Sequence, residues 1–265
     1  MIKTLLKREI KANYKIFAIF IIIITIYSSI IVAMYDPLLG KSLNMMAKSI
    51  PELFRAFNMI DPGLTLLDFI MNYLYGFILI VIPLVFTLIM CYRLIGRYIE
   101  QKSFAYLLSS SYSRIEIIVS QYMTLFIFVF FLLAYTGVLV YLCGYFMFEE
   151  IIALDEFLAL NTGLLFLHLF FLSICYLSVC IFNEIKYSIG IGGGLCFIFI
   201  LIQMLSQASD KIEFLKYFTP LTLFNAKELV SGTSQAINNI LILLIISIVL
   251  FLFSVKQFKN KDLFL

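Results

Sequence analysis

Residues 123–148 read MTLFIFVFFLLAYTGVLVYLCGYFMF, a run that contains no charged side chain. A helix needs roughly 20 apolar residues to cross a hydrocarbon layer of about 30 Å, so this run is long enough to span a membrane. A backbone inside lipid must satisfy its own hydrogen bonds, and the run lacks the alternating pattern of a membrane β-strand. The stretch therefore predicts a transmembrane α-helix.

Five further apolar runs lie on either side of this one. The six predicted spans cover residues 16–34, 70–92, 123–148, 158–182, 188–205 and 237–255. The whole chain of 265 residues is 63% hydrophobic and 13% charged, with a mean hydropathy of +1.06. A soluble domain of this size cannot cover so much apolar surface. The composition therefore predicts an all-α polytopic membrane protein in which residues 1–265 form one transmembrane domain.

The basic residues are distributed unevenly between the two faces that this topology creates. Of the 19 Lys and Arg residues, 13 fall on the face that carries both termini and the loop after the second span. Excess Lys and Arg marks the cytoplasmic side. Both termini are therefore expected in the cytoplasm, and the chain is expected in the plasma membrane of the cell. A net charge of +3 gives no indication of nucleic-acid binding.

Three polar segments carry helical patterns of their own. Four N-terminal lysines recur every four residues from Lys3 to Lys15, which predicts a short helix in the cytoplasmic interface or a basic flank that sets the topology. The external stretch SIPELFRAFNMIDPG, residues 49–63, has a capping box and a Pro-Gly stop. Residues 210–233, before the last span, predict a helix from Pro220 to Val230 and a hairpin that either re-enters the bundle or stays outside it.

The chain shows no pattern typical of an enzyme or a metal site. His168 is the single histidine, in the middle of a span, and has no acidic or cysteine neighbour at ligand spacing, so it is expected to be a core or cavity residue. Glu149 and Glu150 suggest an intramembrane protease motif, but position 154 is Leu154 and further histidines are missing. The six predicted spans contain no Asp, Glu, Lys or Arg, whereas ion-coupled carriers place ionisable groups near the midplane. We therefore expect no catalytic residue, no metal and no bound cofactor, and an energy source supplied by a partner.

The connection between the second and third spans contains EQKSFAYLLSS, residues 100–110. Helical periodicity places Phe104, Leu107 and Leu108 on one face, and Glu100 precedes them. This pattern predicts a short cytoplasmic helix that can press against a soluble partner and pass its motion to both spans. An ordinary interfacial connector is the alternative.

This connection resembles the corresponding loop of ABC-2 type ABC transporter permeases, which has a Glu, a Leu-Leu pair and a Ser-Arg step before the third span. The matching positions are Glu100, Leu107, Leu108, Ser113 and Arg114. Ser103 stands where the family has Gly or Thr, and Ser111 and Tyr112 stand in place of Pro followed by Val or Ile. A second segment, LKYFTPLTLFNAKELVSG, is similar to the family's segment before the last span. Its matching positions are Tyr217, Pro220, Phe224 and Gly232.

The resemblance implies a permease subunit without an ATPase site of its own. Two such subunits, identical or different, would pair with two cytoplasmic ABC ATPase subunits, which bind ATP and Mg. The residues implied in coupling to the ATPase are Glu100, Phe104, Leu107, Leu108 and Arg114. The family mostly exports hydrophobic or amphipathic cargo, and an antimicrobial peptide, a toxin or a drug is expected here. The cargo and the choice between a homodimer and a heterodimer stay open.

Two alternatives remain at this stage. The chain could be a small carrier unrelated to ABC transporters, or the membrane-embedded substrate-binding subunit of a vitamin importer.

The glycines of GIGGG in the fifth span permit close approach of helices. They predict a dimer interface, or alternatively packing within one subunit. These glycines are Gly190, Gly192, Gly193 and Gly194.

Overall fold

The computed structural model describes residues 2–35, 49–56, 65–100, 104, 112–148 and 152–261, and within these ranges it contains helices and no strand. Six helices are long and apolar enough to cross a membrane, which confirms the predicted all-α membrane architecture. They are α1 (Lys3–Ala33), a composite second helix (Leu66–Glu100), α8 (Arg114–Phe148), α9 (Leu154–Ile181), α10 (Ile185–Ala208) and α12 (Ser234–Lys259).

The helices extend beyond the apolar runs from which they were predicted. The clearest case is α8, which begins at Arg114, well before the apolar run starts at Met123. A capping box starts this helix: the Ser113 hydroxyl accepts from the backbone N–H of Glu116 at 3.2 Å, and the Glu116 carboxylate accepts from the N–H of Ser113 at 3.0 Å. Hydropathy locates the lipid-facing part of a helix, whereas local capping decides where the helix begins.

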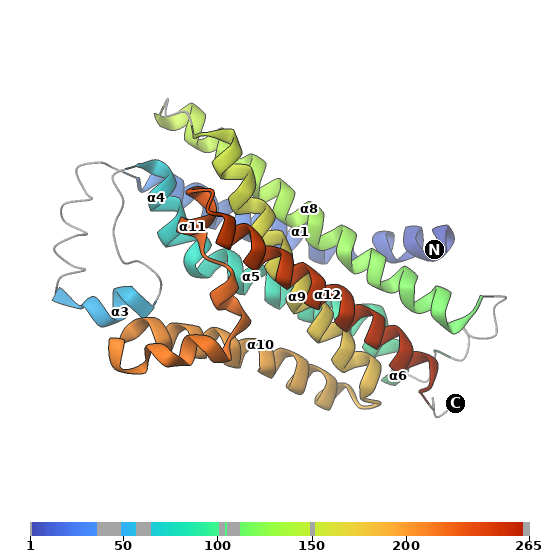
Figure 1. Ribbon diagram of the computed structural model, residues 1–265. Coiled ribbons are helices and arrows are strands. Elements are labelled where there is room, and N and C mark those ends of the chain that lie inside the picture. The colour runs from blue at the N-terminus through green and yellow to red at the C-terminus, as the bar shows by residue number, and fades with distance from the viewer. Residues whose placement is uncertain are drawn as a thin grey trace.

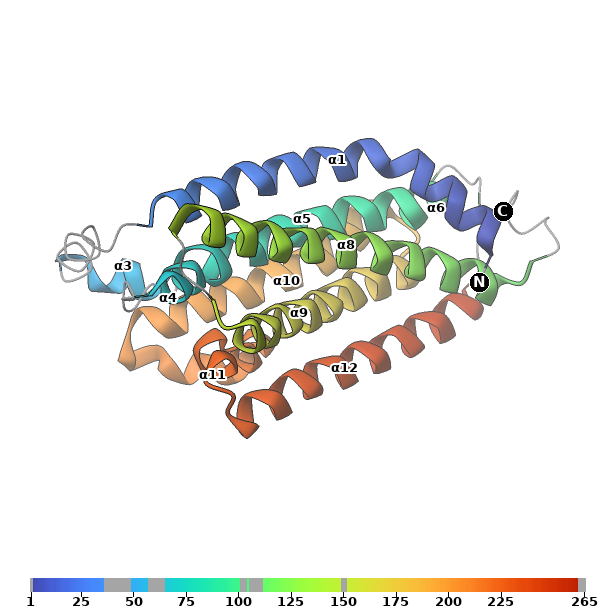
Figure 2. The same cartoon turned by 90° about the horizontal axis from the view of Figure 1, so that it is seen from above.

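The N-terminal segment differs from its prediction, because α1 is one uninterrupted helix from Lys3 to Ala33. The structure does not separate an interfacial helix from the first span, although Figure 2 shows the first turns of α1 bending relative to the rest. No Gly or Pro occurs anywhere in Lys3–Ala33 to break the helix. The lysines of the early turns are exposed, while Leu5 on the opposite side is buried.

The second span is irregular in a way that its sequence did not indicate. It consists of α4 (Leu66–Ile70), η1 (Met71–Ile78), α5 (Leu79–Cys91), η2 (Tyr92–Gly96) and α6 (Arg97–Glu100). The two η segments are π-helical. Long π-helical stretches are rare and occur often at functional sites, because the wider turn changes which carbonyls and side chains face the neighbouring helices.

The central helix of the bundle is α9, which contacts α12, α10, α5 and α8 as well as the short α11 (Ala226–Val230). Figures 1 and 2 show α9 in the middle, with α1, α10 and α12 on the outside. Those outer helices expose large apolar side chains such as Ile22, Leu201 and Ile245. This arrangement is expected for helices whose outer faces contact lipid.

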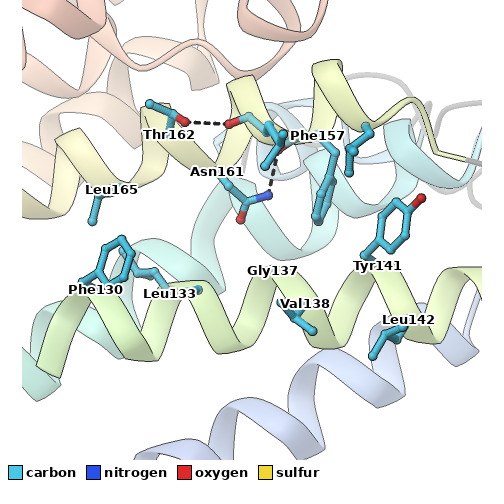
Figure 3. Close-up of a pocket in the computed structure, with 13 residues that line it drawn as sticks. Phe130, Leu133, Gly137, Val138, Tyr141, Leu142, Phe157, Asn161, Thr162 and Leu165 are labelled. Atoms are coloured by element: carbon cyan, nitrogen blue, oxygen red, sulfur yellow. Dashed lines mark hydrogen bonds between the residues drawn. The ribbon is translucent and has the colours of Figure 1, made fainter. Parts of the chain in front are cut away.

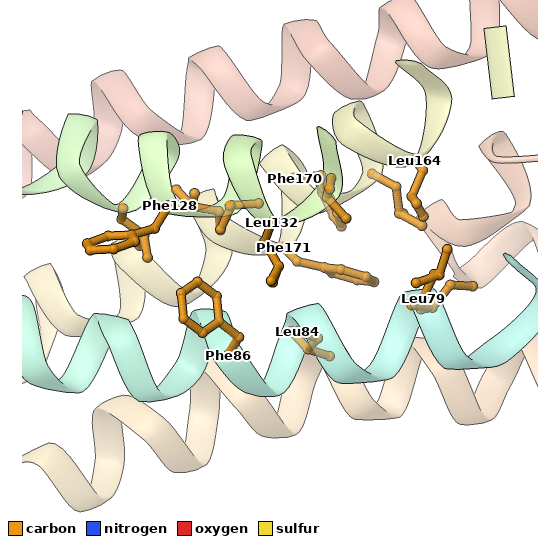
Figure 4. Packing of buried hydrophobic residues seen from close by; sticks show 14 of the residues in the cluster. Leu79, Leu84, Phe86, Phe128, Leu132, Leu164, Phe170 and Phe171 are labelled. Carbon is orange, nitrogen blue, oxygen red and sulfur yellow. The ribbon is translucent and has the colours of Figure 1, made fainter. Parts of the chain in front are cut away.

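Aromatic and leucine side chains fill the interior between α5, α8 and α9 (Figure 4). Phe171 of α9 is fully buried, and Phe86 of α5 meets Phe128 of α8 edge to face, with ring centroids 6.3 Å apart. Burying apolar groups against protein instead of lipid releases no water from them. The gain here comes from van der Waals packing of interlocking side chains.

The segment before α12 folds back along the bundle. After α10, η3 (Asp210–Phe218) contacts α10, and η4 (Pro220–Leu223) contacts both α10 and α12. The helix expected from Pro220 to Val230 is split, because Asn225 caps a separate α11: its side chain accepts from the N–H of Glu228 at 3.4 Å. Gly232, with a φ of +66°, ends this part of the chain before α12 starts.

The start of α1, α6 and the end of α12 lie at the same end of the bundle (Figures 1 and 2). At the opposite end, the short α3 (Pro51–Ala56) contacts α10. We refer to the first of these as the terminal end, which is the predicted cytoplasmic side, and to the other as the α3 end.

Candidate functional site

The predicted coupling residues lie at the terminal end, and Phe104 is the best defined of them. Its side chain is 1% exposed and packs on Phe258 of α12, with ring centroids 5.1 Å apart. Sequence reasoning placed Phe104 on a surface offered to a partner, whereas this ring is buried inside the chain. Glu100 is exposed at the end of α6. Leu107 and Leu108 lie outside the described residues.

Arg114 and Lys261 form a second contact between these elements. The guanidinium of Arg114, at the start of α8, donates to the backbone carbonyl of Lys261 at 2.9 Å. The Lys261 ammonium donates to the carbonyls of Phe182 and Val179 at 2.6 and 3.2 Å, at the C-terminal end of α9. The last carbonyls of a helix lack partners inside the helix and carry partial negative charge, so a lysine is favourable there.

The charge of Lys261 is affected by its position. Burial lowers the pKa of the Lys261 amine to about 8, so near pH 7 the group is still mainly protonated. Its bonds to the two carbonyls are therefore charge-assisted and stronger than neutral ones. Through these bonds the chain after α12 is attached both to the start of α8 and to the end of α9.

A polar cluster joins α1 to the end of the second span. Glu9 and Asn13 are each 2% exposed, four residues apart on the inner face of α1. The Glu9 carboxylate accepts from the Tyr98 hydroxyl and from Arg8, both at 2.8 Å, and the side-chain carbonyl of Asn13 accepts from Arg93 at 2.6 Å. Arg93 and Tyr98 lie just before the connection to the third span.

Sequence reasoning missed this cluster, because Glu9 sits among lysines that suggested only a basic surface. The available signal was the spacing of Glu9 and Asn13, which places both on one helical face opposite the lysines. A cavity of about 140 Å³ lies beside the cluster. The connection between the second and third spans is thus held by α1 on one side and by α9 and α12 on the other.

His168 supplies a further interior contact. Its Nε2 lies 2.7 Å from the backbone carbonyl of Leu79. A carbonyl only accepts, so Nε2 carries the proton. Pro83 explains the contact, since it has no N–H to donate to the carbonyl four residues earlier, which is that of Leu79. His168 is fully buried, as expected for a core residue. Only one of its two ring nitrogens is bonded: Nε2 has a partner, while Nδ1 has none among the described residues.

A second polar contact joins the same two helices nearer the α3 end. The Tyr75 hydroxyl, on the π-helical η1, donates to the side-chain carbonyl of Asn161 on α9 at 2.9 Å. The amide nitrogen of Asn161 donates to the carbonyl of Phe157 at 2.8 Å. Asn161 and His168 are seven residues apart, two helical turns, and therefore face the same side.

A cavity with a volume of about 380 Å³ lies beside Asn161 (Figure 3). Its walls come from α8 and α9 and are mostly apolar. In Figure 3, Phe130 and Leu133 lie at one end, Tyr141 at the other, and Gly137 opposite Asn161. A Cβ on Gly137 would lie 2.9 Å from the Asn161 carbonyl oxygen, so a glycine is needed for this approach.

The glycines of α10 divide into two pairs. A Cβ on Gly192 would lie 2.9 Å from the Cβ of Ser178 on α9, and one on Gly193 would lie 3.0 Å from Leu88 on α5. Both therefore pack within the subunit. Gly190 and Gly194 have no atom of the described residues within 4 Å of such a Cβ, and they share one face, one turn apart.

This division sharpens the test of the predicted dimer interface. Gly190→Leu combined with Gly194→Leu is expected to reduce subunit association in detergent, measured by size-exclusion chromatography with light scattering, because bulky side chains prevent close helix approach. Gly192→Leu, the same exchange on the inner face, should lower the thermal unfolding temperature instead. Unchanged assembly in the outer double variant would show that this face contacts lipid.

Within the described residues, no group of three His, Cys, Asp or Glu side chains is placed to hold a metal ion. Neither a protein-family model nor a curated protein matches the sequence.

Proposed function

We propose that this chain is the membrane-spanning permease subunit of an ATP-driven exporter. A separate cytoplasmic ABC ATPase would bind ATP and Mg and perform the hydrolysis. A second permease subunit would complete the path, and the cargo would be hydrophobic or amphipathic, such as an antimicrobial peptide, a toxin or a drug. Both termini would lie in the cytoplasm, so the terminal end of the bundle would face the ATPase.

The observation that carries this proposal is the set of contacts around the connection between the second and third spans. Phe104 packs on α12, Arg114 binds the backbone of Lys261, and Lys261 binds the last carbonyls of α9. On the other side, Arg93 and Tyr98 bind α1. A push on this connection would therefore reach α12 through Phe104, α9 through Lys261, and α1 through the end of the second span. A permease driven by an external motor requires such contacts.

The roles of the predicted residues follow from their surroundings. Glu100 is exposed and free to meet a basic group of an ATPase. Phe104 and Arg114 instead fix the connection to the bundle and would transmit its motion. Gly190 and Gly194 offer an outward face for the second permease subunit. The absence of Asp, Glu, Lys and Arg from the six predicted spans supports an energy source outside the membrane.

Copurification tests the proposal. The tagged chain should retain an ATPase with Walker motifs encoded by a neighbouring gene, and Glu100→Lys should weaken that association at least about fivefold, or about 1 kcal/mol, by reversing an interfacial charge. Glu52→Lys is the matched control, because Glu52 is also exposed but lies in α3 at the other end of the bundle. No ATPase retained by the unmodified chain would contradict the proposal.

A second candidate is a small carrier unrelated to ABC transporters, and one observation favours it. The buried Nδ1 of His168 has no partner among the described residues, so it is a group that could accept a proton inside the membrane. The substrate-binding subunit of a vitamin importer has no comparable support here.

A further inference from the structure

We infer that the cavity between α8 and α9 binds one acyl chain of a zwitterionic phospholipid from the leaflet at the α3 end. This inference does not depend on an ATPase partner, because it concerns the isolated subunit in a bilayer. It rests on the position, length, polar lining and charge of the cavity.

The position of the cavity determines the medium from which its occupant comes. It is lined by residues of two membrane-crossing helices, between Phe130 and Leu142 on α8 and between Leu154 and Leu165 on α9. Val138 and Leu158 line it and are 59% and 56% exposed, so one side is open to the surroundings. In a membrane those surroundings are hydrocarbon. Leaving the space empty would forfeit van der Waals contacts along its whole wall.

The length of the cavity matches one leaflet. On α9 the lining extends over eleven residue steps, from Leu154 to Leu165, which corresponds to about 16 Å at 1.5 Å per residue. Half of a hydrocarbon core of about 30 Å is about 15 Å. The groove therefore runs from near the membrane surface to near the midplane, the depth that one acyl chain occupies.

The side chains of Asn161 and Thr162 in the groove wall are already bonded, so they do not demand a polar ligand. Asn161 binds Tyr75 and the carbonyl of Phe157, and the Thr162 hydroxyl donates to the carbonyl of Leu158 at 2.8 Å. An apolar chain can therefore lie across this wall without leaving these groups unpaired.

The charge at the outer end favours a particular headgroup. Leu154 marks that end of the cavity, and the next two residues are Asp155 and Glu156 in the first turn of α9. Their carboxylates repel an acidic headgroup and attract an ammonium group. Phosphatidylethanolamine should therefore bind more tightly than phosphatidylglycerol.

The absence of tryptophan from this chain allows a direct test. Phe130→Trp places a single fluorophore at the inner end of the groove. Phe131→Trp places one on the neighbouring residue, which is 57% exposed and does not line the cavity. In detergent, phosphatidylethanolamine brominated near the acyl terminus should quench the first reporter to a plateau at about one lipid per chain and leave the second nearly unquenched at that ratio. A third reporter, Tyr141→Trp at the outer end, should respond best to bromine near the headgroup.

A filling variant provides the control. Ala134→Phe adds a ring inside the groove and should abolish the plateau and the phospholipid retained in native mass spectrometry. Ala18→Phe makes the same exchange on the exposed face of α1 and should change neither. Equal quenching of the Phe130 and Phe131 reporters, or a plateau that persists in Ala134→Phe, would overturn the inference. So would preferential retention of phosphatidylglycerol, or loss of dimer in Ala134→Phe, which would assign the groove to a second copy.

Discussion

Replacing Phe104 with alanine is expected to release the connection between the second and third spans from α12. The ring is 1% exposed against Phe258, and truncating a buried phenylalanine costs about 3–5 kcal/mol. A local contact of this size controls local opening more than global unfolding. Amide hydrogen exchange at residues 97–100, 104, 112 and 113 should therefore accelerate by on the order of 100-fold, which corresponds to about 3 kcal/mol. With an ATPase partner present, less cargo should move for each ATP hydrolysed.

Two further variants make this expectation specific. Phe258→Ala should produce a similar acceleration, and the double variant should add little to either single one, since both remove the same contact between rings. Phe253→Ala, on the same helix but 46% exposed, should change exchange in the connection by less than about 0.5 kcal/mol. If exchange at residues 97–100, 104, 112 and 113 is unchanged in Phe104→Ala, the ring contact does not hold the connection. If exchange accelerates while transport per ATP is unaffected, the connection does not couple the ATPase to the spans.

The six spans could be predicted from sequence because each is a long run without charge, and hydropathy responds directly to that property. The helix ends could not be predicted in the same way. The start of α8 depends on the capping pair Ser113 and Glu116, a local signal outside the apolar run. Likewise, α1 continues through its basic turns because nothing in the sequence breaks the helix there.

The candidate sites were harder to predict, because they depend on helix rotation and on pairings between distant segments. The spacing of Gly190 and Gly194 places them on one face of α10, and Gly192 is about 200° away from Gly190, so their separation could be read from the helical period. The sequence does not indicate which of these two faces of α10 packs against the bundle. The burial of Phe104 depends on Phe258, more than a hundred residues later, and no local pattern indicates that contact.

The contact between His168 and Leu79 also could not be predicted from local sequence patterns. Its removal is expected to reduce the stability of the protein. Both residues lie in apolar runs, and only the position of Pro83, four residues after Leu79, marks a carbonyl that needs a donor. His168 provides the donor at 2.7 Å. His168→Leu should therefore destabilise the protein by about 1–3 kcal/mol, the cost of a buried acceptor without a partner. For a chain of this size each kcal/mol corresponds to a fall in Tm of about 2–4 °C, measurable by thermal unfolding in detergent.

Pro83→Ala should suppress this defect, because alanine restores the N–H that can donate to the Leu79 carbonyl along the helix. In that background His168→Leu should cost less by about 1 kcal/mol or more, a coupling that a double-mutant cycle measures directly. His168→Gln keeps a donor and should be milder than His168→Leu in either background. Equal costs of His168→Leu with and without Pro83 would show that the histidine does not serve the proline-freed carbonyl.

The same variants separate the exporter from a proton-driven carrier. In the exporter, His168 has only this structural task, so Pro83→Ala with His168→Leu should recover both Tm and transport together. In a carrier that uses the free Nδ1 of His168 as its proton acceptor, stability would recover but transport would not, since neither Leu nor Gln can take up a proton. Transport assays in vesicles, with ATP or with a pH gradient as the energy source, measure this difference. Loss of transport in the rescued, stable double variant would contradict the proposed exporter and favour the carrier.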